Sequence, residues 1–135
     1  MDNLIEQLKT EHASILERLI RGNELGLGTD DGYREAWAIK DILSSHLLKE
    51  DRLFYPALRR AAKNNDDLQI LLVTLDDDIK AVGSLVDEFY SSYTVKTDLP
   101  GIADKFTFVF EKLRSRMKNE EDFLFDEFLK LNDAQ

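Results

Sequence analysis

The chain contains no cysteine, and among its 135 residues only two are histidine and only two are proline. Without cysteine it forms no disulfide, no iron–sulfur cluster, no thiolate zinc site and no cysteine nucleophile. No apolar run approaches the roughly 18 residues that a membrane span requires, so we expect no insertion into a membrane. Any imidazole chemistry must use His12 or His46.

Basic residues are also in the minority, because 18 lysines and arginines stand against 27 aspartates and glutamates. This acidic protein has a net charge of -9, and that charge repels the phosphate backbone of nucleic acids. The first residues lack the basic and then apolar start of a signal peptide. We therefore expect a cytoplasmic protein that binds neither nucleic acid nor a membrane.

Residues that interrupt helices gather in three stretches. Four of the six glycines lie between residues 22 and 32, and polar stretches follow at residues 64–67 and 93–100; all three predict loops. The segments between them are rich in helix-forming residues and cover residues 2–21, 31–63, 67–92 and 99–131. The sequence therefore predicts a single all-α domain over residues 1–135.

Apolar residues recur in these segments at steps of three and four, which places them on one face of each helix. In the second segment the series includes Leu53 and ends at Ala57, and in the fourth segment it ends at Phe123. Four such helices with short connections predict an up-down-up-down antiparallel four-helix bundle. Pro56 lies inside the second series and lacks a backbone N–H, so the helix should either bend there or end and restart.

Five polar residues occupy positions in these series where Leu or Ile is expected: His12, His46, Glu50, Arg116 and Glu120. Buried charges are costly unless they pair or bind a metal, so we expect these side chains to meet in the core. Asp76 of the third segment fits a neighbouring series and is a further candidate. Two imidazoles with two or three carboxylates suit iron, manganese or zinc.

The charges of these residues leave two interpretations open. Glu50, Asp76 and Glu120 carry three negative charges, and Arg116 carries one positive charge. One divalent cation neutralises the remainder if both histidines are neutral. Two protonated histidines have the same effect without a metal, and the core then holds a salt-bridge network.

The motifs around these residues resemble those of the hemerythrin-like (HHE cation-binding) family over nearly the whole chain. Three motifs carry the resemblance: Glu11-His12-Ala13-Ser14-Ile15; His46 and Glu50 followed by Phe54-Tyr55-Pro56; and a degenerate copy with Arg116, Glu120-Glu121 and Leu124-Phe125-Asp126. The resemblance implies a four-helix bundle. It also implies a centre of two irons, bridged by two carboxylates.

By this resemblance, one half of the centre is intact. Glu50 and Glu120 would be the bridging carboxylates, and His12 and His46 would bind one iron. We expect one ion of iron or zinc at this position, with Asp76 as a further ligand, or no ion at all.

The other half of the centre is lost by the same comparison, because imidazoles are replaced by Asp76 and Arg116. A guanidinium cannot bind a metal, since it stays protonated and has no free lone pair. We therefore expect Arg116 to replace the second ion and to bridge Glu50, Glu120 and Asp76. Reversible oxygen binding as peroxide needs two irons, and so we do not expect it.

The first function that the sequence predicts is the binding of one metal ion. The alternative is a metal-free regulatory or protein-interaction domain, in which a buried Arg–carboxylate–His network replaces the diiron centre and the partner is an unknown protein. A redox enzyme acting on oxygen, peroxide or nitric oxide is the weakest hypothesis, because the second metal position is compromised. No residues form a recognisable catalytic motif, and we expect no enzyme activity.

Overall fold

A computed structural model of the chain describes residues 2–94 and 101–133, and in these residues all regular structure is helical. The elements in chain order are α1 (Asp2–Leu25), α2 (Asp30–Lys49), η1 (Glu50–Phe54), α3 (Tyr55–Ala62), α4 (Asp66–Ser92), α5 (Ile102–Asn119), η2 (Glu120–Leu124) and α6 (Phe125–Asp133). The two short elements η1 and η2 are π-helical turns. They join α2 to α3 and α5 to α6 without a break in the helix.

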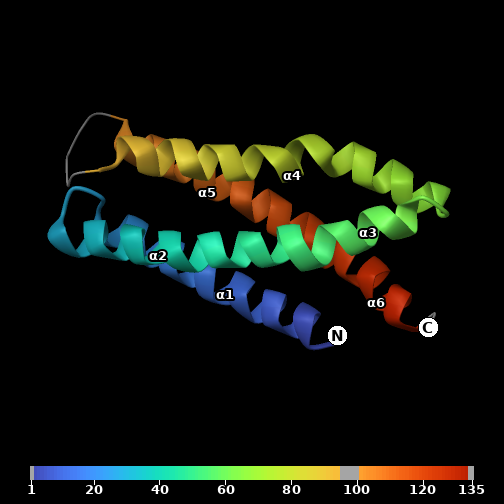
Figure 1. Cartoon of the computed structure of the whole chain (residues 1–135). Helices are drawn as coiled ribbons and strands as arrows, with labels where there is room; N and C mark the ends of the chain where they lie inside the picture. The colour runs from blue at the N-terminus through green and yellow to red at the C-terminus, as the bar shows by residue number, and fades with distance from the viewer. Residues whose placement is uncertain (1, 95–100, 134–135) are drawn as a thin grey trace.

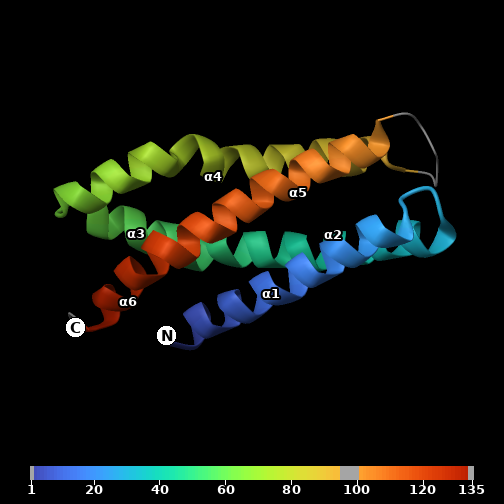
Figure 2. The same cartoon turned by 180° about the vertical axis from the view of Figure 1, so that it is seen from behind.

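The elements form four rods, namely α1, α2–η1–α3, α4 and α5–η2–α6. Successive rods run antiparallel (Figure 1; Figure 2). The rod of α1 packs against α2 and α5, and α4 packs against α3 and α5. The first turns of α1 and the last turns of α6 lie at the end of the bundle that carries the α3–α4 connection (Figure 1). This arrangement is the up-down-up-down four-helix bundle that the sequence predicts. None of the described helices is both long and apolar enough to cross a membrane.

The first connection is shorter than the glycine pattern predicts. Helix α1 continues through Gly22 to Leu25, and α2 begins at Asp30, so the loop covers only residues 26–29. Gly32 belongs to the first turn of α2, where the missing side chain allows a close approach to the loop backbone. The predicted start of the fourth helix at residue 99 lies outside the described residues, and α5 is described from Ile102.

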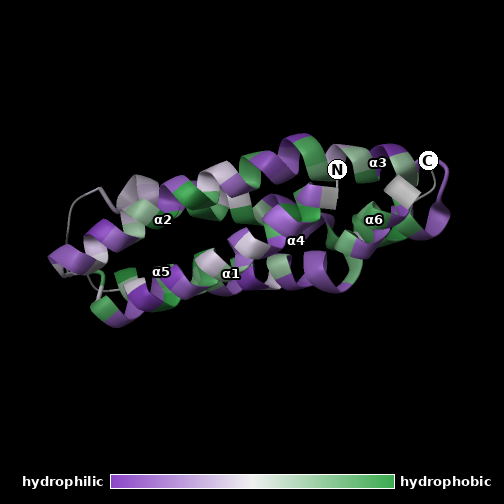
Figure 3. Ribbon diagram, turned by 90° about the horizontal axis from the view of Figure 1, so that it is seen from below, coloured by the Kyte–Doolittle hydropathy of each residue, from purple (hydrophilic) through white to green (hydrophobic). Residues whose placement is uncertain are grey.

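The buried faces of the helices form two hydrophobic clusters with a polar layer between them. Along α1, Leu8 packs in one cluster, Ile15 packs in the other, and His12 lies between them. The residues that recur along α1 at steps of three and four are all buried, namely Ile5, Leu8, His12, Ile15 and Leu19. Purple and green alternate along all four rods in Figure 3, as expected for helices with one apolar face. The polar layer therefore interrupts an otherwise continuous core.

The π-helical turns change which residues face the core. The apolar series predicts that Leu53 and Phe123 are buried, yet they are 57% and 50% exposed. A π-helical turn contains more residues than an α-helical turn, so it shifts the register of the helix that follows. The next residues, Phe54 and Leu124, are buried instead. The predicted core positions are therefore wrong by one residue at these two points.

Pro56 lies directly after the first of these turns, at the start of α3. The backbone N–H of Tyr55 donates to the carbonyl oxygen of Glu50, five residues earlier. This longer hydrogen bond lets the chain pass a residue that has no N–H without ending the helix. In η2 the backbone N–H of Phe125 donates to the carbonyl oxygen of Glu120 in the equivalent way, although η2 contains no proline.

Candidate metal centre

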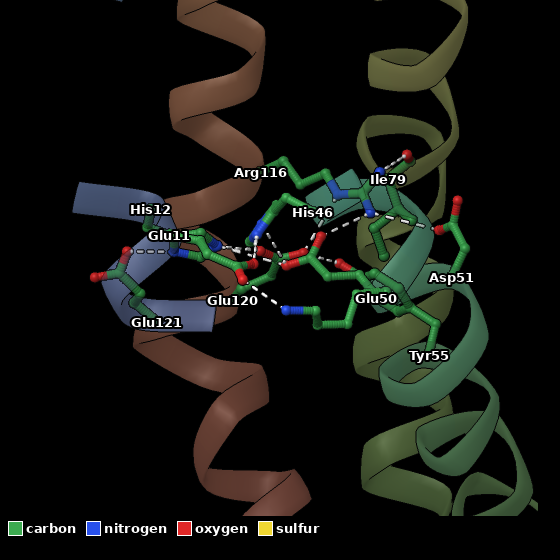
Figure 4. Close-up of polar contacts among 11 residues, drawn as sticks. Glu11, His12, His46, Glu50, Asp51, Tyr55, Ile79, Arg116, Glu120 and Glu121 are labelled. Atoms are coloured by element: carbon green, nitrogen blue, oxygen red, sulfur yellow. Dashed lines mark hydrogen bonds and ion pairs between the residues drawn. The ribbon is translucent and has the colours of Figure 1, made fainter. Parts of the chain in front are cut away.

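Four buried side chains meet in the polar layer. His12 comes from α1, His46 from α2, Glu50 from the start of η1 and Glu120 from the start of η2. Each is at most 1% exposed, and their ligand atoms all lie within 4.8 Å of one another. Figure 4 shows these side chains pointing toward one another from their helices. The structure thus brings together four of the ligands predicted from the sequence.

The imidazole nitrogens lie close to the carboxylate oxygens. Nε2 of His12 is 3.1 Å from Oε1 of Glu120 and 3.5 Å from Oε2 of Glu50, and Nε2 of His46 is 3.1 Å from that same Oε2. Within residues 2–94 and 101–133, none of these four atoms has a hydrogen-bond partner. Buried polar atoms without partners are rare. Four that face one another suit a shared metal ion.

The second nitrogen of each imidazole contacts a glutamate. Nδ1 of His12 lies 2.8 Å from Oε2 of Glu121, and Nδ1 of His46 lies 2.7 Å from Oε1 of Glu11. The other carboxylate oxygen of Glu11 accepts a hydrogen bond from Nζ of Lys49 at 2.6 Å. A carboxylate at Nδ1 favours the proton on that nitrogen and leaves the Nε2 lone pair available to a metal. The outer glutamates therefore orient both imidazoles for binding.

Arg116 contacts the same two carboxylates from the side opposite the histidines (Figure 4). Its Nη2 donates to Oε1 of Glu50 at 3.0 Å, and its Nε donates to Oε2 of Glu120 at 3.3 Å. Its Nη1 donates to the carbonyl oxygen of Ile79 at 2.7 Å. Each glutamate therefore gives one oxygen to the guanidinium and turns the other toward the histidines.

Asp76 does not join this group, and the sequence-based expectation of a fifth ligand requires correction. Its carboxylate lies 2.9 Å from Nζ of Lys80 and its side chain is 38% exposed. Helix α4 instead presents the carbonyl oxygen of Ile79 to Arg116. At this partly exposed position a carboxylate keeps contact with water and pairs with a lysine one turn away.

Tyr55 extends the group on the side of the arginine. Its hydroxyl donates to Oε2 of Glu120 at 2.5 Å, and its ring centre lies 5.1 Å from Cζ of Arg116. The sequence pattern does not indicate a site role for Tyr55, Glu11 or Glu121. Each of these residues lies in one of the three motifs, next to or a few positions from a ligand. That proximity in sequence is the signal that could have indicated their roles.

Burial and neighbouring charges have opposing effects on the pKa values of the site. Burial disfavours protonated His12, but the carboxylates of Glu120 and Glu50 outweigh it and raise the pKa to about 10. The pKa of His46 is also raised, because Glu50 outweighs burial there. Burial and then the charge of Glu50 raise the pKa of Glu120. Burial of Glu50 is outweighed by the two histidines, which lower its pKa.

The charges of the site match one divalent cation. The two inner and two outer glutamates carry four negative charges, while Arg116 and Lys49 carry two positive charges. The remaining two negative charges are balanced by one divalent ion if the imidazoles are neutral. They are balanced equally by a proton on each imidazole. The residues present therefore fit one metal ion, and protons compete with that ion for the same nitrogens.

Comparison with known proteins agrees with this geometry. A family model described as Hemerythrin HHE cation binding domain matches residues 3–128. Neither the curated proteins nor the solved structures give a significant match. The matched residues include all four converging ligands and nearly the whole chain. The chain therefore belongs to the hemerythrin HHE cation-binding domain family.

Proposed function

We propose that the chain binds one divalent cation, iron or zinc, through His12, His46, Glu50 and Glu120. The observation that carries this proposal is the convergence of four buried ligand atoms that lack hydrogen-bond partners in the described part of the chain. The other polar atoms of these side chains have hydrogen-bond partners. Each imidazole Nδ1 contacts an outer glutamate, and the remaining carboxylate oxygens accept from Tyr55 or Arg116. Imidazole nitrogen and carboxylate oxygen are ligands that both iron and zinc accept.

In this proposal Arg116 takes the place of a second metal ion. Its guanidinium binds the outward oxygens of Glu50 and Glu120, which in a two-metal centre would bind the second ion. Arginine remains protonated and cannot act as a ligand. We therefore infer that the chain binds a cation, that it does not carry oxygen between two irons, and that it is not an enzyme.

The chain's own residues prepare the position for the ion. Glu121 and Glu11 fix the ring orientation of His12 and His46, respectively. The hydrophobic clusters on both sides exclude water from the layer. The bound ion would supply the positive charge that both inner carboxylates require. Binding then needs the loss of the imidazole protons, and so it should release protons to the solution.

The number of metal ions per chain tests this proposal most directly. Elemental mass spectrometry is applied to protein as purified, and again after anaerobic incubation with ferrous iron or with zinc followed by desalting. We expect about one ion per chain, its loss in His12→Ala, and its retention in the matched variant Asp76→Ala. Two ions per chain would contradict the role of Arg116. No retained ion under any condition would contradict the proposal.

A second candidate is the metal-free regulatory or protein-interaction domain with an unknown protein partner. The raised pKa values of His12 and His46 favour it, because protonated imidazoles neutralise the inner carboxylates as a metal would. In that case a chelator and added zinc would leave the thermal midpoint unchanged. A midpoint that rises with zinc concentration, as mass action requires of a ligand that binds the folded state, would exclude this candidate.

A further inference from the structure

We propose that Arg116 makes this site selective for divalent over trivalent cations. The inference rests on the proposed function, because it requires an ion between His12 and His46. The fixed positive charge of Arg116 determines which ionic charge the two carboxylates bind best.

The guanidinium is held rigidly enough for its charge to act from a constant place. Three separate acceptors bind it, namely the carboxylates of Glu50 and Glu120 and the carbonyl oxygen of Ile79. The ring of Tyr55 lies beside it, and Arg116 is only 3% exposed. A side chain with this many contacts cannot turn to solvent when an ion binds.

The two inner carboxylates are shared between the guanidinium and the ion. Oε1 of Glu50 accepts from Arg116, while Oε2 faces the histidines. Glu120 divides its oxygens in the same way, with Oε2 toward Arg116 and Oε1 toward His12. One positive charge is therefore already present on this carboxylate pair, and only part of its negative charge remains for a metal.

A cation held by the far oxygens of these carboxylates would lie close to the guanidinium. At an effective dielectric constant of about 20 and a separation of about 5 Å, two unit charges repel enough to weaken binding about a hundredfold. A trivalent ion has one more charge than a divalent ion, so the repulsion from Arg116 lowers its affinity by one further factor of about a hundred. Arg116 should therefore shift the affinity ratio about a hundredfold toward divalent ions.

The neighbouring charges do not cancel this effect. Glu11 is paired with Lys49 at 2.6 Å, so that acidic group is already balanced. Glu121, which contacts Nδ1 of His12, has a 44% exposed side chain and is screened by water. Asp51 approaches Nη2 of Arg116 at 3.6 Å, but its side chain is 61% exposed. Because water screens an exposed carboxylate strongly, Asp51 offsets only a small part of the buried positive charge.

Zinc and gallium provide a matched pair of probes, because both are closed-shell ions without redox chemistry and they differ in charge. The dissociation constants of Zn²⁺ and Ga³⁺ are measured by competition with a chelator of known affinity. The proteins compared are the wild type, the charge-preserving variant Arg116→Lys and the neutral variant Arg116→Gln. Arg114→Gln serves as the control, since it removes the same charge from an exposed position of α5.

Arg116→Gln should change the affinity ratio about a hundredfold in favour of gallium, whereas Arg116→Lys and Arg114→Gln should change it less than fivefold. For iron, a hundredfold ratio corresponds to a midpoint potential about 120 mV higher with the arginine than without it. Anaerobic potentiometry of iron-loaded protein measures that difference independently.

An unchanged ratio in Arg116→Gln would overturn the inference and leave the proposed function intact. The absence of zinc binding in the wild type would instead overturn the proposed function. If Arg116→Gln does not fold, Arg116→Met removes the same charge and keeps an unbranched side chain.

Discussion

Arg116 and Glu50 lie 3.0 Å apart inside the bundle, although 66 positions of sequence separate them. One comes from α5 and the other from the first residue of η1, and neither is more than 3% exposed. A buried ion pair is tolerated only where hydrogen bonds satisfy both partners, and Arg116 makes three such contacts. This pair therefore joins the two halves of the chain at the site.

Replacing Arg116 with Leu should destabilise the metal-free protein by about 3–5 kcal/mol, because it leaves two buried carboxylates without their cation. Urea unfolding in the presence of a chelator measures the change. Arg114→Leu on the same helix is the control, and its exposed position predicts a change below about 0.5 kcal/mol. Equal stability of the Arg116→Leu variant and the wild type would show that the guanidinium does not support the carboxylates.

Tyr55→Phe removes one hydroxyl that holds Glu120. We expect a loss of about 1–3 kcal/mol in stability, as for other buried bonds to charged groups. We also expect zinc affinity to fall about tenfold, because the carboxylate is less firmly oriented.

Tyr90→Phe provides the control for this effect. Its hydroxyl donates to the carbonyl oxygen of Ala36 at 2.6 Å, within the hydrophobic cluster away from the metal ligands. The Tyr90→Phe variant should have a lower free energy of unfolding and an unchanged zinc affinity. Isothermal titration calorimetry measures that affinity. Equal zinc affinities in the two variants would remove the positioning role of Tyr55.

The metal-free protein should lose about 3 kcal/mol of stability between about pH 6 and pH 9. In the folded state, the carboxylates of Glu120 and Glu50 overcome burial and raise the pKa of His12 from 6.5 to about 10. Its protonated form therefore stabilises the fold fully below the unfolded value, and this contribution declines as pH rises toward the folded value. The raised pKa of Glu120 acts in the same direction.

Chemical unfolding with a chelator at several pH values measures this decline. Zinc-saturated protein should show the opposite trend, because zinc binds only deprotonated imidazoles and its affinity increases with pH. A pH-independent stability of the metal-free protein would contradict protonation of the buried histidine.

Two glycine substitutions should have opposite effects. Gly32→Ala places a Cβ 1.8 Å from the carbonyl oxygen of Gly26, and the required backbone shift should cost about 1–3 kcal/mol. Gly83 lies inside α4, and a Cβ added there would meet no atom of the described residues within 4 Å apart from its chain neighbours and the nearby backbone of its own helix. Gly83→Ala should stabilise the protein by about 0.5–1 kcal/mol, because alanine favours a helix. Differential scanning calorimetry of both variants checks the difference in sign.

The side-chain pattern alone was sufficient for the bundle and for the four converging residues. Steps of three and four residues are a local property of the helix, so the apolar series of α1 could be recognised without tertiary structure. His12, His46, Glu50 and Glu120 interrupt such series, and a buried polar side chain must find a partner. Those two facts place them together in the core of any bundle that this sequence forms.

The same pattern failed where it assumed an uninterrupted α-helix. It predicted that Leu53 and Phe123 are buried, but each π-helical turn moves the core position by one residue, to Phe54 and Leu124. In η1 the proline at position 56 offers a local cause. In η2 the sequence contains no proline that would indicate the turn.

The partners of the ligands were decided only by tertiary structure. Asp76 fitted a predicted series, yet it turns to Lys80 at a partly exposed position, and Ile79 contributes a backbone carbonyl that no side-chain pattern reveals. Glu11 and Glu121 reach imidazoles on other helices. Periodicity fixes the face on which a residue lies within its own helix. The rotation and distance of the neighbouring helix determine what that face meets.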